Sequence, residues 1–157
     1  MSAAGCFHGP GNLHHGVDET IVAGRTNLSS STGQKILIQD IILHPDYDSA
    51  TGSINIAIVK LSTPLQFNSN VQPACLPNGT FNPEGGTTAF ISGWGITPKL
   101  KFFDVQKINH DVCTKLLREI DIFRTFSPKM VCSIARNNGD ACNGDEGGPL
   151  IVPGRSF

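Results

Sequence analysis

The sequence has no excess of charge of either sign and no long hydrophobic run. Its 12 Lys and Arg residues nearly balance 13 Asp and Glu residues, which gives a formal net charge of -1. Because the charges form no long run, no nucleic acid and no acidic membrane is expected as a partner. No apolar stretch approaches the roughly 20 residues of a membrane-spanning helix, so the sequence predicts no such helix.

A secretory signal peptide is also missing, because Met1–Cys6 has no basic region followed by an apolar core. Two N-glycosylation sequons, which begin at Asn27 and Asn78, nevertheless matter only on the secretory route. Two alternatives stay open. Either the protein is not exported, or its true start lies upstream of Met1.

The cysteines form no Cys-x-x-Cys pair, and their spacing suits disulfides of a secreted protein better than a zinc site. They are Cys6, Cys75, Cys113, Cys132 and Cys142. Because five is an odd number, at least one is free or pairs outside this chain. His8, His14 and His15 are close in sequence, but a glycine-rich surface loop explains them more simply, so neither a metal nor a cofactor is expected.

The 157 residues fit one modest domain, and 17 Gly with 10 Pro favour short strands joined by tight turns. The composition therefore predicts an all-β fold. Strands are expected over residues 20–24, 35–43, 54–61 and 87–92. In the first three, apolar residues occur at both alternating sets of positions, which predicts burial on both faces of the sheet.

One short helix is expected over residues 111–123. Asp111 lies at its start, and Ser127-Pro128 would stop it. Its apolar residues fall on one face at helical spacing, which predicts core packing. They are Val112, Leu116, Leu117, Ile120 and Phe123.

The most informative segment is Gly139–Leu150. It resembles the active-site segment of trypsin- and chymotrypsin-like serine proteases at every defining position except one. Where that family carries its nucleophilic serine, this chain has Glu146. A twelve-residue match with a single change is a specific signal.

Other segments extend the resemblance in the family's order. Ser2–Cys6 is similar to the Ala-Ala-His-Cys segment, with Gly5 in the place of the catalytic histidine. Asn55–Leu61 is similar to the segment that opens with the catalytic aspartate, here Asn55. Pro73–Pro77 and Ser92–Gly95 match two further landmarks.

The resemblance implies two packed antiparallel β-barrels of the chymotrypsin type with a cleft between them. Residues 1–67 would form part of the first barrel, residues 68–86 a connector, and residues 87–157 part of the second barrel. Folds of this kind need roughly 200–250 residues. Both barrels are therefore expected to be incomplete, which would expose sheet edges and make the isolated chain marginally stable.

Acyl transfer by this mechanism needs a hydroxyl nucleophile, an imidazole base and a carboxylate that orients the imidazole. Gly5 has no side chain, Asn55 has no charge, and Glu146 is a poor acyl-transfer nucleophile. No catalytic residue is therefore expected. The Glu146 carboxylate would lie beside the backbone amides of Gly144 and Glu146, so we expect it to fold into this donor pocket and plug it.

The resemblance gives two further acids a role. Asp140 matches the acidic floor of the pocket that takes a substrate Arg or Lys, and with Gly144 it is the expected substrate-binding pair; alternatively, Asp140 is an inherited acid in an incomplete pocket. Asp145 matches the acid that pairs with the new N-terminal amine of activated family members. Nothing in the chain supplies that amine, so Asp145 is expected to stay unpaired.

The resemblance also assigns the cysteines. Cys113 and Cys132 match a local disulfide, whereas Cys6, Cys75 and Cys142 match positions whose partners would lie outside this chain. Ala89 and Val152 occupy the two positions of another family disulfide, which is therefore lost from both sides.

Together these observations predict a secreted, catalytically inactive serine-protease homologue. It would act by binding or regulation, with a protease or a protease substrate as its partner. Two alternatives remain: a fragment or aberrant product of an active trypsin-like endopeptidase that cleaves after Arg or Lys, or a degraded gene product with no role.

Overall fold

The computed structural model describes residues 1–9, 12–13, 19–119, 127, 129–136, 139, 141 and 143–154. In chain order the elements are η1 (Ala4–Phe7, a 3-10 helix), β1 (His8–Gly9), β2 (Asn12–Leu13), β3 (Thr20–Ala23), β4 (Gln34–Leu43), β5 (Ala57–Leu61), β6 (Thr88–Gly93), β7 (Lys101–Ile108), α1 (His110–Glu119), β8 (Cys132–Ala135) and β9 (Leu150–Ile151). The prediction of a mostly β fold with one short helix is confirmed.

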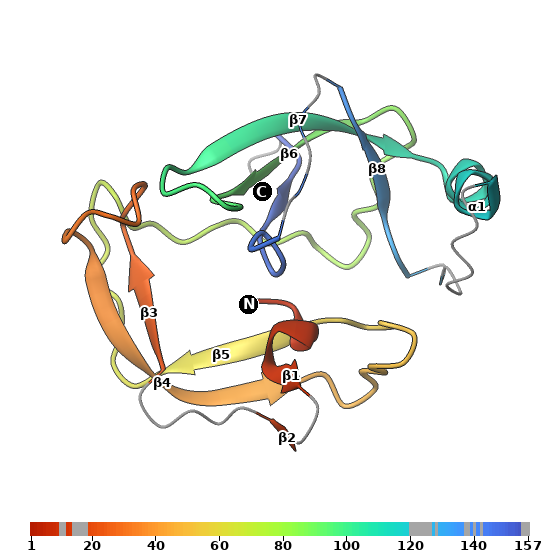
Figure 1. Cartoon of the computed structure of the whole chain (residues 1–157). Helices are drawn as coiled ribbons and strands as arrows, with labels where there is room; N and C mark the ends of the chain where they lie inside the picture. The colour runs from red at the N-terminus through yellow and green to blue at the C-terminus, as the bar shows by residue number, and fades with distance from the viewer. Residues whose placement is uncertain are drawn as a thin grey trace.

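Two larger antiparallel sheets make up the framework. The first has the strand order β3-β4-β5, and the second has the order β8-β7-β6-β9. Residues 62–87 contain no strand and connect the two sheets. Figure 1 shows the sheets as separate layers, with the N-terminus between them and α1 at one end of the second sheet. This arrangement agrees with the chymotrypsin-type fold.

The core of the first sheet forms where η1 packs on β4 and β5. Ala4, Ile41 and Ala57 are buried there, and four partly buried residues pack against them: Phe7, Ile38, Leu43 and Tyr47. An irregularity of the β4–β5 pairing between Ile38 and Asp40 adds a residue to β4, so that Ile38 and Ile41 contact the same core despite their odd spacing.

The prediction that the first sheet is buried on both faces is wrong. Along β4 the buried Ile36 and Ile41 alternate with Leu37 and Ile42, whose exposed fractions are 49% and 50%. In β5, Ile58 is 53% exposed. Successive strand residues point to opposite faces, and the core just described covers only one of them.

The prediction for the helix is correct at its start and wrong for two residues of its apolar face. Asp111 lies in the first turn of α1, but Val112 and Leu116 are 48% and 39% exposed. The buried residue of α1 is Cys113. Residues 120–126, and with them the predicted end of the helix, lie outside the described residues.

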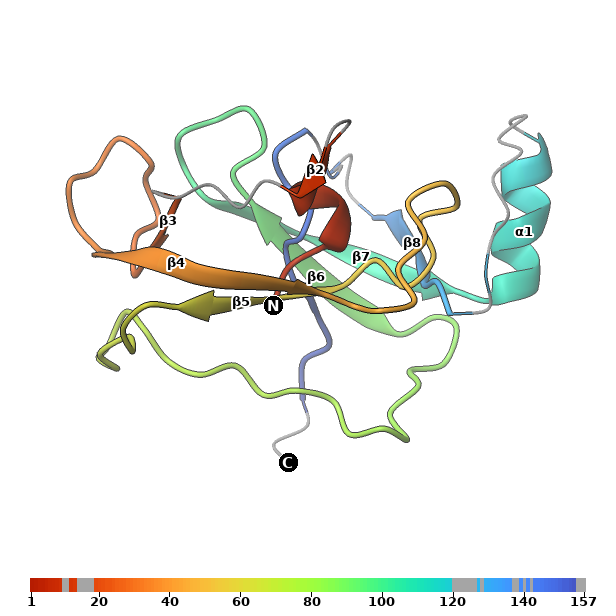
Figure 2. The same cartoon turned by 90° about the horizontal axis from the view of Figure 1, so that it is seen from below.

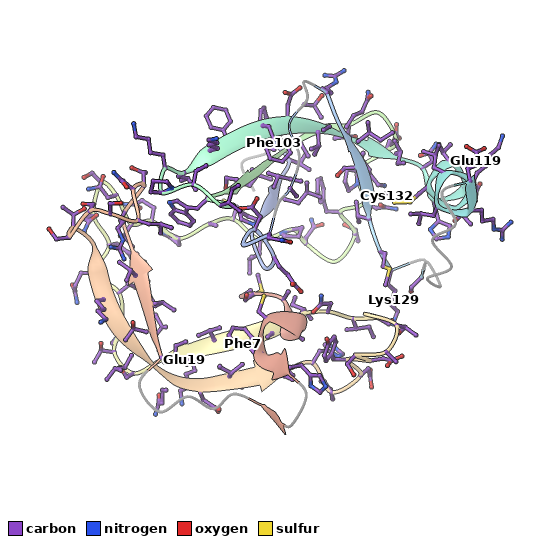
Figure 3. All side chains as sticks on the ribbon, viewed as in Figure 1. Phe7, Glu19, Phe103, Glu119, Lys129 and Cys132 are labelled. Atoms are coloured by element: carbon purple, nitrogen blue, oxygen red, sulfur yellow. A yellow bond between two sulfur atoms is a disulfide. The ribbon has the colours of Figure 1, made fainter. Side chains whose placement is uncertain are left out.

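A disulfide bond holds α1 at the sheet, although Val112 and Leu116 are exposed. It joins Cys113 of α1 to Cys132 at the start of β8, with a Cα–Cα distance of 6.2 Å. Figure 3 shows this bond beside Cys132 at the end of the second sheet. The pairing is the one that the resemblance implies.

The two sheets are linked through the loop that follows β3. Asn27 forms a β-bridge with Lys99, and the Leu100 amide donates to the Thr26 carbonyl at 2.7 Å. The indole N–H of Trp94 donates to the same carbonyl at 3.2 Å. Backbone pairing and one side-chain hydrogen bond therefore hold the first sheet to the second.

The register of β6 with β9 locates Ala89 and Val152, the two positions at which the family carries a further disulfide. Phe90 pairs with Ile151 and Ile91 with Leu150, so the next pair in this register is Ala89 and Val152. Ala89 is 2% exposed and also lies opposite Val105. The two positions are therefore neighbours across adjacent strands.

We predict that the double variant Ala89→Cys/Val152→Cys forms a disulfide bond. It would close a long loop of the unfolded chain and raise the free energy of unfolding by about 2–4 kcal/mol. Mass mapping under non-reducing conditions and urea unfolding check this, with the two single variants as controls. A double variant that stays reduced, or pairs with Cys6 or Cys75, would contradict the register.

Candidate functional site

The site begins at the N-terminal segment, which is paired with the start of β5. Ser2 and Ala57 exchange two backbone hydrogen bonds, of 2.9 and 2.8 Å. Just after Ser2 the chain turns through η1, where the small Ala4 is fully buried. This pairing brings Gly5 to Asn55, and the Gly5 amide donates to Oδ1 of Asn55 at 2.7 Å.

A hydrogen-bonded loop positions Asn55. The backbones of Asp48 and Ser53 form a β-bridge, and the Asp48 carboxylate accepts from the Ala50 amide at 2.9 Å and the Thr51 hydroxyl at 2.6 Å. The Thr51 hydroxyl, followed by the Ala50 amide, holds the pKa of Asp48 below its ordinary value. The charged carboxylate therefore favours the closed loop.

Ile54 has a strained backbone. It is the one non-glycine residue with a positive φ, 54°, in the part of the chain that the structure describes. A β-branched side chain disfavours this conformation, because it crowds the backbone. The strain lies one residue before Asn55, where the chain leaves the loop and enters β5.

The side chain of Glu146, in the segment before β9, lies next to Gly5 and Asn55. A Cβ added to Gly5 would lie 2.8 Å from Oε1 of Glu146 and 3.5 Å from both Asn55 Oδ1 and Tyr47 Oη. The Cys6 thiol also donates to the Glu146 carbonyl at 3.5 Å. The three positions that the resemblance assigns to the catalytic triad thus lie together, although Glu146 is separated from the other two by most of the chain.

A glycine makes this approach feasible. Gly147 has a φ of 80° and faces the N-terminal segment, where a Cβ would clash with the Ser2 hydroxyl and lie 3.1 Å from the Ala3 amide. Any other residue at this position would be strained by the positive φ, would push the Ser2 side chain aside and would crowd the Ala3 amide. A glycine therefore lets the segment that carries Glu146 lie close to the N-terminal segment.

The prediction that Glu146 plugs the donor pocket is wrong. Its side chain is exposed, and its carboxylate lies beside Gly5. Among the described residues, neither the Gly144 amide nor the Glu146 amide donates to this carboxylate. Because Gly5 has no side chain, the space beside its Cα is open. The side chain of Glu146 extends into this space.

The prediction that Asp145 stays unpaired is also wrong. Its Oδ1 accepts from the Gly95 amide at 2.7 Å. A Cβ on Gly93 would collide with this carboxylate, so a glycine at that position leaves room for it. The Gly95 amide therefore donates to the Asp145 carboxylate, whereas the resemblance implies an N-terminal amine as the partner of this acid.

Gly144, the other member of the expected substrate-binding pair, packs against backbone. Its φ is 97°, and a Cβ there would lie 2.9 Å from the Gly95 carbonyl. Asp140 and Cys142 lie outside the described residues. Cys6 and Cys75 are exposed free thiols.

Sequence reasoning missed Tyr47, which borders the site. His8 contacts its ring edge-on, with the ring centroids 5.7 Å apart. The residues around Gly5 thus offer a carboxylate, a carboxamide, a phenol and a thiol. Within the described ranges, no cluster of metal-ligating side chains and no helix able to span a membrane is found; His14 and His15 lie outside those ranges.

The order of the segments, the two sheets and the meeting of three distant positions define a chain of the chymotrypsin-type class. Residues 1–156 match the family described as Trypsin, and the chain belongs to this family. Curated relatives include "Transmembrane protease serine 11G" of Mus musculus, 33% identical over 142 residues, and its namesake in Rattus norvegicus, 32% identical. Each match covers 85% of this chain and 33% of the relative, so the chain spans about a third of their length.

We predict that Ile54→Asn raises the free energy of unfolding by about 1 kcal/mol, because asparagine adopts a positive φ more readily than a β-branched residue. Chemical unfolding measures the change. The matched control is Ile56→Asn, in an exposed isoleucine that lacks the positive φ, which should not stabilise the chain. Destabilisation by Ile54→Asn equal to that of the control would contradict the role of strain.

Proposed function

We propose that this chain is a non-catalytic member of the trypsin family that acts by binding. The observation that supports this most directly is the composition of the triad positions, where Gly5, Asn55 and Glu146 lie together. The partner is a protein, either a protease or a protease substrate. Roles of this kind are those of a decoy, a cofactor or a regulator in a protease cascade.

The chemistry of the three residues supports inactivity. Gly5 can neither take nor return a proton, and the Asn55 carboxamide is engaged by the Gly5 amide. Glu146 places a carboxylate where the family has a hydroxyl, and its charge would repel the oxyanion that forms during acyl transfer. Loss of a single triad member already costs about 10⁴-fold in related enzymes.

The relatives suggest where this protein works. They are named transmembrane proteases, and this chain carries two sequons and the Cys113–Cys132 disulfide, which suit an oxidising compartment. We infer that it is a secreted or extracellular glycoprotein. The alternative, a fragment or aberrant product of an active endopeptidase, makes the opposite prediction for catalysis.

The first test measures peptide cleavage. The purified chain should release no chromophore from Arg and Lys amide substrates and should not react with a fluorophosphonate, since it has no activated serine. An active trypsin-family protease at equal concentration is the positive control. Turnover that co-purifies with the chain and is blocked by a serine-directed inhibitor would overturn the proposal in favour of the enzymatic alternative.

A second test rebuilds the triad. We predict that Gly5→His/Asn55→Asp/Glu146→Ser reacts with a fluorophosphonate at least 100-fold faster than Glu146→Ser alone, because a serine needs an imidazole to take its proton. Replacing Glu146 also removes the oxygen that a Cβ at residue 5 would meet.

The matched control for the rebuilt triad is Asn55→Asp/Glu146→Ser, which carries serine and aspartate but still has Gly5. Circular dichroism and unfolding curves verify that all variants fold alike. Equal reactivity of the control and the triple variant, or none in either, would mean that Gly5 does not occupy the position of the base.

A further inference from the structure

A surface pocket that none of the triad positions lines lies between the connecting segment and residues 152–154. Its volume is about 580 Å³, and its walls come from residues 78, 80–84, 87 and 152–154. Figure 2 shows the connecting segment, coloured yellow to green, on the side of the molecule opposite η1. Apolar walls are provided by Phe81, Pro83, Val152 and Pro153, and Glu84 adds a charged rim.

Asn78 lies in the wall of this pocket and opens the sequon Asn78-Gly79-Thr80. It is exposed, and the Thr80 hydroxyl donates to its Oδ1 at 3.0 Å. A turn follows, in which the Phe81 amide donates to the Asn78 carbonyl at 3.0 Å. Among the described residues nothing accepts a hydrogen bond from Asn78 Nδ2, so this nitrogen is accessible for modification.

Asn27 opens the other sequon in different surroundings. It is half-buried, and its Oδ1 accepts from the Ser29 amide at 3.0 Å instead of from a hydroxyl. Its backbone is bridged to Lys99, and the next residue donates to the Pro98 carbonyl at 2.8 Å. Asn27 therefore lies in the contact between the two sheets.

We propose that Asn78 carries an N-linked glycan whose first sugar lies in the adjoining pocket, and that Asn27 is unmodified. The volume lies in the range of small-ligand sites and accommodates one N-acetylhexosamine. The Phe81 ring and the prolines offer apolar surface to the faces of the sugar, while the Glu84 carboxylate can accept from its hydroxyls. This inference rests on the secretory route of the proposed function, and it does not depend on whether the chain is catalytic.

The modification is a group transfer that the secretory pathway supplies. Nδ2 of Asn78 attacks the anomeric carbon of an oligosaccharide linked to a lipid pyrophosphate. The new C–N bond forms as the C–O bond to the pyrophosphate breaks. The pyrophosphate leaves with the electron pair, and the amide releases one proton. No oxidation or reduction takes place.

The site of attachment is tested by secreting the chain from eukaryotic cells behind a cleavable signal and measuring its mass before and after peptide-N-glycosidase treatment. We expect one glycan on the parent chain and on Asn27→Gln, and none on Asn78→Gln. Thr80→Ser should keep the glycan and Thr80→Ala should lose it, because only the former retains the sequon. Two glycans, a single glycan on Asn27, or none on the secreted chain would overturn the assignment.

The position of the first sugar is tested by the rate at which the same enzyme releases the glycan from the native protein. Phe81→Ala removes a pocket wall and should speed release at least 5-fold. The matched control is Phe67→Ala, in an exposed phenylalanine that does not line the pocket and should leave the rate unchanged. Release from Phe81→Ala at the parental rate, with both variants folded, would overturn the placement in the pocket.

Discussion

The pairing of the N-terminal segment with the start of β5 is the interaction on which the site depends. Two backbone bonds between Ser2 and Ala57, and one from Gly5 to Asn55, fix both segments in one geometry. They also seat η1 on the core of the first sheet, where the fully buried Ala4 leaves no room for a larger residue. Gly147 then packs against this fixed segment, so the position of Glu146 follows from the same pairing.

Close backbone packing gives the second half of the site its shape. Gly93, Gly95 and Gly144 let the segment before Glu146 lie against the end of β6 without intervening side chains. Asp145 then reaches the Gly95 amide and forms a hydrogen bond that ties the two segments together. This half of the site is therefore built from contacts between chain segments, which do not depend on the side chains of residues 5, 55 and 146.

Much of the fold could be predicted from the sequence, because β4, β6 and the start of α1 have strong local patterns. The strands β7, β8 and β9 were missed: β7 carries Lys101, Asp104 and Lys107 among its apolar residues, while the other two have only four and two residues. The triad positions were assigned from the residues of three matching segments and from the order of those segments. The orientation of Glu146 and the partner of Asp145 depend on distant glycines, which no local pattern reveals.

The hydrogen bond from Trp94 to Thr26 has a spectroscopic consequence. Trp94 is the single tryptophan among the 157 residues, and its indole spans the junction between the two sheets. Its fluorescence therefore reports on how the two halves are held together, while far-ultraviolet circular dichroism reports on the strands within each half. A difference between the two signals during unfolding would reveal whether the halves separate before their own strands melt.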